Sequence, residues 1–553
     1  MQAGLTDKYF KGVVKMQCFL ETASSLAVIK GTSDFFPLKT GVMLKNGRYS
    51  FQVAYRASDN MWKCRLSVES DIDGFITMRE EALAPCTMPV TGTEYLLSEE
   101  PTVYPDILRE YGRNGICLRK NMWQAAWITI SGENLPEGRH AIRFVLSDSC
   151  GIRLAETSFE LEILRAKLEK SDLIYTNWFH YDCLSQVYGE KPFSIKYNAV
   201  LRNYVKNAVE HGMNMLYVPL FTPPLDTAVG GERITAQLLD IEKKGDKYNF
   251  SFEKTAAFLA LARECGIEYF EMPHLFTQWG AKYTPKIEII DNGVCKKAFG
   301  WHVAADSPEY AEFLAQLLPE LKRFLQREGV YEKSYFHVSD EPNETMFESY
   351  SKARALLERF LPDCKSIEAL SHYEFYRSGY VKTPVVATSA YEEFCQNAVK
   401  KIWVYTCSWQ KEDCLSNRFM NFPPQRNRIL GMQLYVNEIA GYLHWGYNFY
   451  NSCDSLYPIN PYSVTDGGGT FESGDAFVVY PGKDGPLDSV RHEVFCDGLQ
   501  DYRALKTIEK KIGRDKVLAL LRAEGMEDGF KKYPKSAMWH VAFRKKLDYM
   551  IAE

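Results

Sequence analysis

At 553 residues the chain is longer than one ordinary hydrophobic core needs, so we expect two or three domains. Its 66 basic and 71 acidic residues give a formal net charge of -5, which offers no general electrostatic reason to bind nucleic acid or an anionic membrane. Aromatic residues make up 14% of the chain, and their flat apolar faces suit sugar rings. A neutral or small substrate is therefore the expected partner.

The start of the chain has no apolar stretch behind a basic segment, and no later segment approaches about eighteen uninterrupted apolar residues. We therefore expect no integral membrane association and a cytoplasmic location, or a secreted one if a leader has been removed. The 14 cysteines form no Cys-x-x-Cys motif, and the histidines show no His-x-x-x-His spacing. The sequence thus predicts buried free thiols, no metal and no other cofactor, and it leaves the oligomeric state open.

Short alternating runs separated by turn signals predict an immunoglobulin-like β-sandwich over residues 1–165. Two of these runs, 42–45 and 49–55, flank Asn46-Gly47, which is typical of a hairpin turn. Alternate residues from Tyr49 to Tyr55 would share one face. Further strand candidates are 123–130, 141–146 and 159–163. No catalytic pattern stands out here, so we expect a structural role or a wall beside the substrate.

From residue 172 the rhythm changes to apolar strand, loop and amphipathic helix, which predicts a (β/α)₈ TIM barrel over residues 172–510. The eight strand candidates are 173–178, 215–218, 267–272, 335–338, 366–370, 385–388, 402–406 and 441–445. An excursion at 226–250 would contain its own hairpin at 244–246. Residues 511–553 predict a C-terminal helical extension packed on the barrel.

The carboxyl ends of the strands gather polar and aromatic side chains, and in a TIM barrel that rim carries the chemistry. The residues at these ends are Trp178, His180, Thr222, His274, Trp279, Asp340, Glu341, His372, Tyr405, Trp409, Trp445, Tyr447 and Asn448. Carboxylates and amides bind hydroxyl groups, and aromatic rings cover the apolar faces of pyranoses. Each aromatic alone is more often a packing residue, but together on one rim they favour a saccharide site.

Asp340 and Glu341 follow an apolar run and precede Pro342, which suits a first helical turn. A structural alternative is that they complement the positive end of the next helix. Glycosidases commonly use two carboxyl groups on different strands, roughly 5 to 9.5 Å apart, which an adjacent pair does not match simply. The pair does match substrate-assisted catalysis, in which a 2-acetamido group attacks its own anomeric carbon while one carboxylate steers the amide and the next protonates the leaving oxygen.

Several motifs make nearly the whole chain resemble glycoside hydrolase family 123, the β-N-acetylgalactosaminidases, and in particular a clostridial-type member. The motifs are Ser339-Asp340-Glu341-Pro342, Gly441-Tyr442-Leu443-His444-Trp445-Gly446-Tyr447-Asn448, Tyr480-Pro481-Gly482, Ser489-Val490-Arg491-His492-Glu493 and Asp497-Gly498-Leu499-Gln500-Asp501-Tyr502. The resemblance implies that Asp340 orients and polarises the acetamido N–H and that Glu341 is the general acid/base. It also implies terminal β-linked N-acetylgalactosamine as the substrate, notably on glycosphingolipid glycans.

Four further residues are binding candidates at this stage. Arg491 and Glu493 begin a helix beneath a Gly/Pro-rich loop and could reach the rim. Tyr405 lies at the end of the seventh predicted strand and Tyr447 follows the eighth, and either hydroxyl could hold the acetamide oxygen during its attack. Two other functions stay open: a β-N-acetylglucosaminidase resembling glycoside hydrolase family 20, and a glycan-binding barrel without catalysis.

Overall fold

The computed structural model describes residues 16–112, 115–132, 134–278 and 280–553. The chain forms two compact units, one from residues up to 82, 108–168 and 541–553, the other from 83–107 and 169–540. The domain boundaries predicted from the sequence differ from the boundaries of these two units. Residues 83–107, inside the predicted sandwich range, belong to the second unit, and residues 541–553, inside the predicted C-terminal extension, belong to the first.

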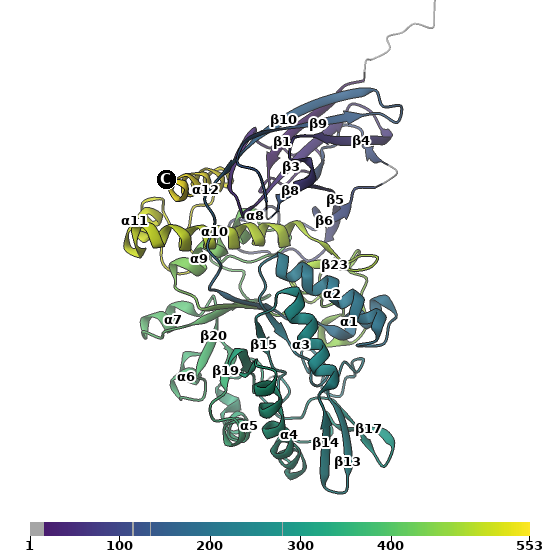
Figure 1. The fold of residues 1–553 in the computed structure, drawn as a ribbon, viewed down its shortest axis with the longest axis vertical. Helices are drawn as coiled ribbons and strands as arrows, with labels where there is room; N and C mark the ends of the chain where they lie inside the picture. Colours follow the sequence, from purple (N-terminus) through teal and green to yellow (C-terminus); the bar gives the residue numbers. More distant parts are fainter. Residues whose placement is uncertain (1–15, 113–114, 133, 279) are drawn as a thin grey trace, which may run out of the picture. The chain divides into compact units, whose positions relative to one another are not determined.

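The N-terminal β-structure consists of two five-stranded sheets, ordered β1-β3-β8-β5-β6 and β2-β10-β9-β4-β7 (Figure 1). Their strands are β1 Cys18–Ser24, β2 Thr40–Leu44, β3 Arg48–Ala57, β4 Met61–Glu69, β5 Ile76–Cys86, β6 Thr102–Glu110, β7 Ile116–Leu118, β8 Gln124–Ser131, β9 Gly138–Ser147 and β10 Arg153–Leu164. Phe51 of β3 stacks on Phe159 of β10 with ring centroids 4.2 Å apart, and both rings are buried. Side chains of the two sheets thus meet in one core, and the predicted β-sandwich is confirmed.

The predicted hairpin at Asn46-Gly47 is wrong. The turn exists, because the Gly47 amide donates to the Leu44 carbonyl at 2.8 Å. However, β2 pairs with β10, whereas β3 pairs with β1 and β8. A type I′ hairpin turn needs positive φ at both central residues, and neither Asn46 nor Gly47 has one. The Asn46 side chain is instead fixed on the Leu168 backbone by bonds of 2.9 and 2.7 Å, so the chain passes from one sheet to the other.

The second unit contains a closed barrel of eight parallel strands, and each overlaps one of the predicted strands. The strands are β11 Ile174–Asn177, β12 Met215–Tyr217, β15 Tyr269–Glu271, β18 Ser334–Phe336, β19 Lys365–Leu370, β20 Thr383–Ala387, β21 Trp403–Thr406 and β22 Gly441–His444. The ring closes because β22 pairs with β11 as well as β21, with Tyr442 opposite Tyr175. The predicted TIM barrel is therefore confirmed.

Helices follow the strands around the barrel and continue beyond it (Figure 1). They are α1 Tyr181–Tyr188, α2 Ile195–Glu210, α3 Glu253–Cys265, α4 Pro308–Arg327, α5 Phe347–Phe360, α6 Tyr373–Arg377, α7 Tyr391–Gln396, α8 Pro424–Arg428, α9 Leu430–Val436, α10 Val490–Ile512, α11 Arg514–Ala523 and α12 Ala537–Ala552. The side chains of Ser194, Ser307 and Ser489 cap α2, α4 and α10 by accepting a backbone N–H of the first turn. A Cβ at Gly431 of α9 would lie 1.8 Å from the Gly498 carbonyl oxygen of α10, so these glycines let the two helices meet closely.

Two excursions, one after β12 and one after β15, build a further sheet ordered β14-β13-β16-β17, and its strand β14 packs against α4 (Figure 1). The remaining elements are β13 Asp240–Lys244, β14 Lys247–Ser251, β16 Ile287–Asp291, β17 Val294–Phe299, β23 Val479–Pro481, β24 Pro486–Asp488, and the 3₁₀ helices η1 Asp73–Phe75, η2 Tyr331–Lys333, η3 Glu344–Met346 and η4 Cys453–Ser455. The pairing of β13 with β14 confirms the predicted hairpin at 244–246. The second excursion, which supplies β16 and β17, was not foreseen.

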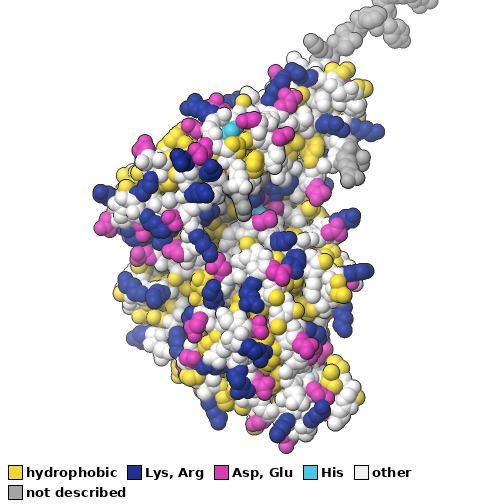
Figure 2. Space-filling view, in the orientation of Figure 1, with side chains coloured by type: hydrophobic (Ala, Val, Ile, Leu, Met, Phe, Trp, Pro, Cys, Tyr) yellow, Lys and Arg dark blue, Asp and Glu magenta, His cyan; other side chains and the backbone are white. Residues whose placement is uncertain are grey.

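Basic and acidic side chains are interspersed on the face shown in Figure 2. None of the helices in the described part of the chain is long and apolar enough to span a bilayer. All 14 cysteines are free thiols, as predicted. The prediction that they are buried is wrong for four exposed thiols: Cys117 and Cys295 on edge strands, Cys150 in a turn and Cys395 on helix α7.

Candidate active site

A pocket with a volume of about 180 Å³ opens at the carboxyl ends of the barrel strands. Its lining residues are Trp178, Leu225, Asp226, Gln278, Asp340, Glu341, Ala369, Tyr405, Cys407, Ser408, Trp409, Leu443, Trp445, Phe471 and Asp475. Pockets for drug-sized ligands measure roughly 300–1,000 Å³, so this one suits a smaller unit such as a single sugar ring. The lining includes four acidic side chains, and besides Tyr405 it includes four aromatic rings, so it offers both hydrogen-bond acceptors and flat apolar faces.

Asp340 and Glu341 lie just beyond the end of β18 and both face this pocket. Glu341 has a φ of 43°, a region that costs a residue with a side chain roughly 1–3 kcal/mol and that persists where the surroundings enforce it. Such enforcement is present, because the Ser339 hydroxyl donates to the Thr277 carbonyl at 2.8 Å. The N-cap residue of α5 is Met346, so the carboxylates do not cap that helix. The structural alternative for this pair is therefore wrong.

Burial changes the proton affinity of both carboxyl groups. It raises the pKa of Asp340 well above the ordinary carboxyl value, and the neighbouring charge of Glu341 raises it further. Burial also raises the pKa of Glu341, although the Tyr405 hydroxyl, which donates to its Oε1 at 2.6 Å, lowers it in part. The pair therefore retains a proton at a pH where exposed carboxyl groups are ionised.

A buried hydrogen-bonded layer supports the pair from inside the barrel. His337 Nε2 lies 2.6 Å from Glu271 Oε1, and His337 Nδ1 lies 3.6 Å from Glu368 Oε1. Burial would lower the pKa of His337, but these two carboxylates raise it to about 9. The indole of Trp178 donates to Glu271 at 2.7 Å, and the hydroxyl of Tyr350 donates to Glu368 at 2.7 Å. A protonated imidazole thus lies beneath Asp340 and favours its ionised form.

The opposite wall carries a carboxylate of different character, Asp475. The Trp445 indole and the Ser408 hydroxyl both donate to its Oδ2 at 2.8 Å. Burial would raise the pKa of Asp475, but His444, whose Nε2 lies 3.4 Å from Oδ1, and the charge of Arg418 lower it below the ordinary value. A Cβ at Gly446 would lie 2.4 Å from the Ala476 carbonyl oxygen, so glycine lets this loop approach the end of β22.

Six of the predicted site residues meet in the pocket. They are Trp178, Asp340, Glu341, Tyr405, Trp409 and Trp445. His274 lies one layer deeper, where its ring stacks on His337 with centroids 4.3 Å apart and its Nδ1 lies 3.2 Å from the Tyr217 hydroxyl. Trp279 lies outside the described residues.

Two neighbours of Trp445 that the sequence nominated do not line the pocket. Tyr447 is buried, and its hydroxyl donates to the Asn207 side chain at 2.7 Å. Asn448 is also buried, and its amide exchanges bonds of 2.9 and 3.1 Å with the His180 backbone. Both side chains therefore join the loop after β22 to its neighbours, and neither is available to a substrate.

Three other nominated residues also lie away from the pocket lining. Arg491 forms a buried ion pair with Asp106, with two N···O distances of 3.0 Å. Glu493 is fully buried, and His211 Nε2 lies 3.2 Å from its Oε1. His372 is exposed at the start of α6. Arg491 and Glu493 fix the N-terminal part of α10, which explains their pattern in the sequence without a substrate contact.

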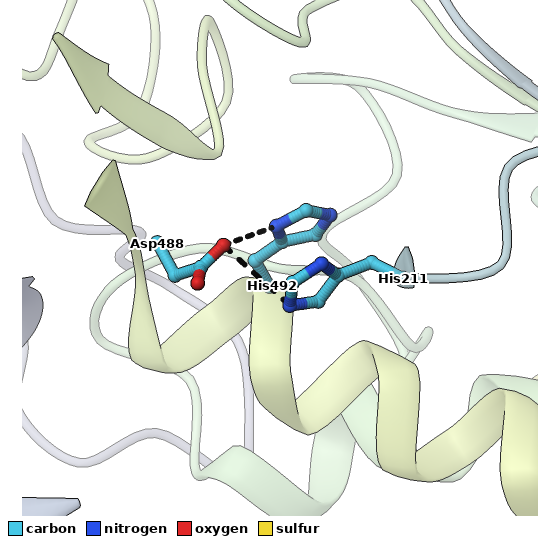
Figure 3. A group of neighbouring side chains, drawn as sticks. All are labelled: His211, Asp488 and His492. Carbon is cyan, nitrogen blue, oxygen red and sulfur yellow. Dashed lines mark hydrogen bonds and ion pairs between the residues drawn. The ribbon is translucent and has the colours of Figure 1, made fainter. Parts of the chain in front are cut away.

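Several clusters bring together side chains of types that bind metals. In Figure 3, His211 Nε2 and His492 Nδ1 both point toward Asp488 Oδ1, at 3.5 and 3.4 Å. Their rings stack with centroids 3.8 Å apart and planes inclined by 16°. A metal ion at about 2.0–2.1 Å from imidazole nitrogen lies close to the ring plane, a condition that stacked rings cannot both meet for one ion. The observed arrangement suits hydrogen bonding to the carboxylate.

The stacked pair of His274 and His337 beside Glu368 has the same geometric difficulty, with ring planes inclined by 22°. A third group, Asp226, Cys453 and Asp454, is partly exposed, and its Asp226 belongs to the pocket lining. The ring planes of His274 and His337 therefore do not converge on one metal position, and the third group contains no imidazole. The absence of a metal from the reaction stays a prediction.

Sequence reasoning missed both the deeper layer and the far wall. Glu271 and Glu368 each stand inside an apolar barrel strand, and an acidic residue at such a position is a signal for an inward-facing functional group. Asp475, Asp226 and Gln278 lie in long connections without a periodic pattern. No local feature marks these three as pocket residues.

An acid-lined pocket at the strand ends of a TIM barrel that follows a β-sandwich is an arrangement found in glycoside hydrolases. The model of the glycoside hydrolase 123 catalytic domain matches residues 178–508. The chain therefore belongs to glycoside hydrolase family 123 and is a glycosidase. A comparison with curated protein sequences finds no match.

Solved structures resemble the fold to different degrees. A family 123 glycoside hydrolase from Clostridium perfringens superposes with a TM-score of 0.71 at 12% identity, covering 97% of each chain. A β-glucuronidase from Parabacteroides merdae gives a TM-score of 0.31 at 11% identity, covering 87% of this chain and 52% of its own. The first match extends over the sandwich and the barrel together, so the two-part architecture is shared.

Proposed function

We propose that the protein is a retaining exo-glycosidase that removes terminal β-linked N-acetylgalactosamine from glycans by substrate-assisted catalysis. The observation that carries this proposal is that Asp340 and Glu341, adjacent in the chain, both line one pocket of monosaccharide size. When the substrate's own 2-acetamido group is the nucleophile, no carboxylate is needed on the opposite face of the ring. Neighbouring carboxyl groups then suffice.

Each carboxyl group has its own part in this reaction. Asp340 accepts the acetamido N–H, while the acetamide oxygen attacks the anomeric carbon and the bond to the leaving oxygen breaks. Glu341 gives its proton to that leaving oxygen. The resulting oxazoline is opened by water, whose proton goes to Glu341, and the two inversions retain the β configuration.

A protein nucleophile is the competing arrangement, and two further acids line the pocket. Asp475 holds hydrogen bonds from Trp445 and Ser408 on the same oxygen, which weakens it as a nucleophile. Burial raises the pKa of Asp226 to about 7, so this carboxyl group keeps its proton over much of the acidic range. The acetamido group is therefore the better nucleophile for this pocket.

The directions of the pKa shifts support a reaction in which substrate binding decides which carboxyl group of the pair carries the proton. In the free protein burial raises the pKa of both carboxyl groups, and the Tyr405 hydroxyl stabilises Glu341 as a carboxylate. An acetamido N–H donated to Asp340 would stabilise its ionised form, as His337 beneath it already does. The shared proton would then reside on Glu341, where the leaving oxygen needs it.

The Clostridium perfringens protein is described in terms of glycolipid glycan hydrolysis. That description, together with the pocket's size, supports glycosphingolipid oligosaccharides as substrates from which one terminal residue is released. The partner is thus a glycan carried on a small molecule or a lipid.

The first test compares 4-nitrophenyl glycosides. We expect rapid release of 4-nitrophenol from the β-N-acetylgalactosaminide and little from the β-glucoside, which lacks the acetamido nucleophile. Faster turnover of the N-acetylglucosaminide would replace the proposed substrate by its epimer. If no 2-acetamido sugar is hydrolysed although calorimetry detects glycan binding, the barrel binds glycans without catalysis and the proposal fails.

Replacing Tyr405 by Phe tests what its hydroxyl does. Because the hydroxyl stabilises the ionised Glu341, its loss raises the pKa of that group, and the alkaline limb of the kcat/KM profile should move to higher pH. The Tyr447→Phe variant is the matched control, since its hydroxyl bonds to Asn207 outside the pocket and the profile should not move. If kcat of Tyr405→Phe falls at every pH while the alkaline limb of the kcat/KM profile stays in place, Tyr405 holds the acetamide oxygen instead.

A further inference from the structure

Trp409 is the most exposed aromatic side chain of the pocket. It is 77% exposed, although it lines the same pocket as Glu341. An indole left open to water lacks the stabilisation that burial of a large apolar side chain gives. A ligand that covers the ring recovers that free energy. Trp409, exposed at the pocket mouth, is therefore a candidate contact for a bound ligand.

The backbone around Trp409 is held firmly. Ser408 donates to Asp475 at 2.8 Å, and Gln410, only 2% exposed, accepts from the Cys407 amide at 2.8 Å. The Asn417 side chain donates to the carbonyls of Cys407 and Gln410, both at 2.9 Å. Residues on each side of Trp409 are thus fixed while its indole extends into solvent. A platform prepared in this way loses little conformational entropy on binding.

The place of Trp409 relative to Glu341 indicates which part of a substrate would meet it. Tyr405, which donates to Glu341 at 2.6 Å, is the penultimate residue of β21, and Trp409 lies four residues later in the connection that follows. A pocket of about 180 Å³ takes one sugar ring, so whatever is attached to the anomeric oxygen must lie at its mouth. That oxygen is the atom that Glu341 protonates in the proposed reaction. The mouth beside Trp409 is thus on the leaving-group side.

We propose that Trp409 is the platform of a leaving-group subsite that stacks on the apolar face of a second sugar ring. The inference rests on the proposed function and deepens it, because it identifies the substrate as a glycan whose terminal residue is linked to another pyranose. Carbon-bound hydrogens on one face of a pyranose match a flat indole, whereas a short alkyl aglycone offers almost nothing to cover it. Trp409 is therefore a specificity-determining residue.

The test uses two substrates with the same terminal sugar. One is the β-linked disaccharide of N-acetylgalactosamine on galactose, and the other is methyl β-N-acetylgalactosaminide. Both leaving groups are alcohols that need the proton of Glu341, so they differ mainly in the second ring. For Trp409→Ala we expect kcat/KM to fall by roughly 10- to 100-fold on the disaccharide and to stay within about two-fold on the methyl glycoside. Trp409→Phe, which keeps a flat ring, should recover much of the loss.

The control is Trp62→Ala, which removes an indole that is 66% exposed on β4 of the sandwich, and both substrates should react as before. An equal loss on the two substrates for Trp409→Ala would overturn the subsite, because the ring would then shape the terminal pocket. An unchanged disaccharide rate would overturn it as well. If the wild-type protein hydrolyses neither substrate, the proposed function fails and the subsite with it, an outcome distinct from the other two.

Discussion

Glu341→Gln is expected to lower kcat/KM on a glycolipid oligosaccharide by about 10²- to 10⁴-fold, the usual worth of one acid/base group, and to lower it much less on an activated aryl glycoside. An aryl leaving group departs without a proton, whereas a sugar alcohol does not. Gln has nearly the shape of Glu and still accepts from the Tyr405 hydroxyl, so the pocket is preserved. The difference between the two losses of kcat/KM therefore measures the contribution of proton transfer to the leaving oxygen.

The measurement must be kcat/KM, which covers the steps up to the first irreversible one. Opening of the oxazoline needs a base, so kcat of the variant can be low even on the aryl substrate. Glu332→Gln is the matched control, because Glu332 is exposed at the opposite end of β18 and should leave both rates unchanged. Equal losses of kcat/KM on the two substrates for Glu341→Gln would show that this group does not protonate the leaving oxygen.

Asp340→Asn should impair both substrates, by about 10²-fold or more, because the acetamido group must be oriented whatever departs. Asn offers an oxygen to the N–H but no charge to balance the cation that develops as the oxazoline forms. Asp340 lies above the imidazole of His337, whose pKa of about 9 keeps it protonated near neutral pH. In the variant the His337 cation keeps Glu271 and Glu368 beside it but loses the nearby charge of Asp340.

Two further measurements separate this role from a loss of structure. The free sugar N-acetylgalactosamine should still bind Asp340→Asn in a calorimeter, because the rest of the pocket is unchanged. A thiazoline analogue of the oxazoline should bind the variant much more weakly than the wild-type protein, because its protonated ring nitrogen carries the positive charge that the Asp340 carboxylate balances and the neutral free sugar does not. An Asp340→Asn variant with nearly wild-type kcat/KM on both substrates would mean that the roles of the two carboxyl groups are exchanged or that the mechanism differs.

The pH dependence links the two variants. The pKa values of Asp340 and Glu341 are both raised above that of an ordinary carboxyl group. The value of kcat/KM should therefore remain high at a pH where exposed carboxyl groups are fully ionised, and it should fall when the pair loses its last proton. In Asp340→Asn the negative neighbour of Glu341 is gone, the pKa of Glu341 falls, and the alkaline limb should move to lower pH. This direction is opposite to that expected for Tyr405→Phe.

The sequence by itself determined the two-part architecture and the carboxylate pair that lines the pocket. Each barrel strand is a short apolar run between amphipathic segments, and this rhythm depends on neighbours along the chain, so all eight were located. Asp340 and Glu341 were found because the end of a predicted strand fixes which rim they reach. Trp178, Tyr405, Trp409 and Trp445 follow from the same rule.

The tertiary structure decided what local patterns do not encode. After a strand ends, the direction of each side chain depends on distant partners, which is why Trp445 faces the pocket while Tyr447 turns to Asn207 and Asn448 to the His180 backbone. Turn residues did not set strand pairing either, because Asn46 found its partner at Leu168, over a hundred positions away, where it bonds at 2.9 Å.

Asp475 is the clearest case of a residue that only the folded chain reveals. It comes from the long connection after β22, and it reaches the wall because Gly446 permits a close approach and because Trp445 and Ser408 donate to it. The raised pKa values of Asp340 and Glu341 belong to the same category. They arise from burial and from the proximity of charges, which are properties of three-dimensional packing, whereas the presence of two carboxyl groups side by side is a property of the sequence.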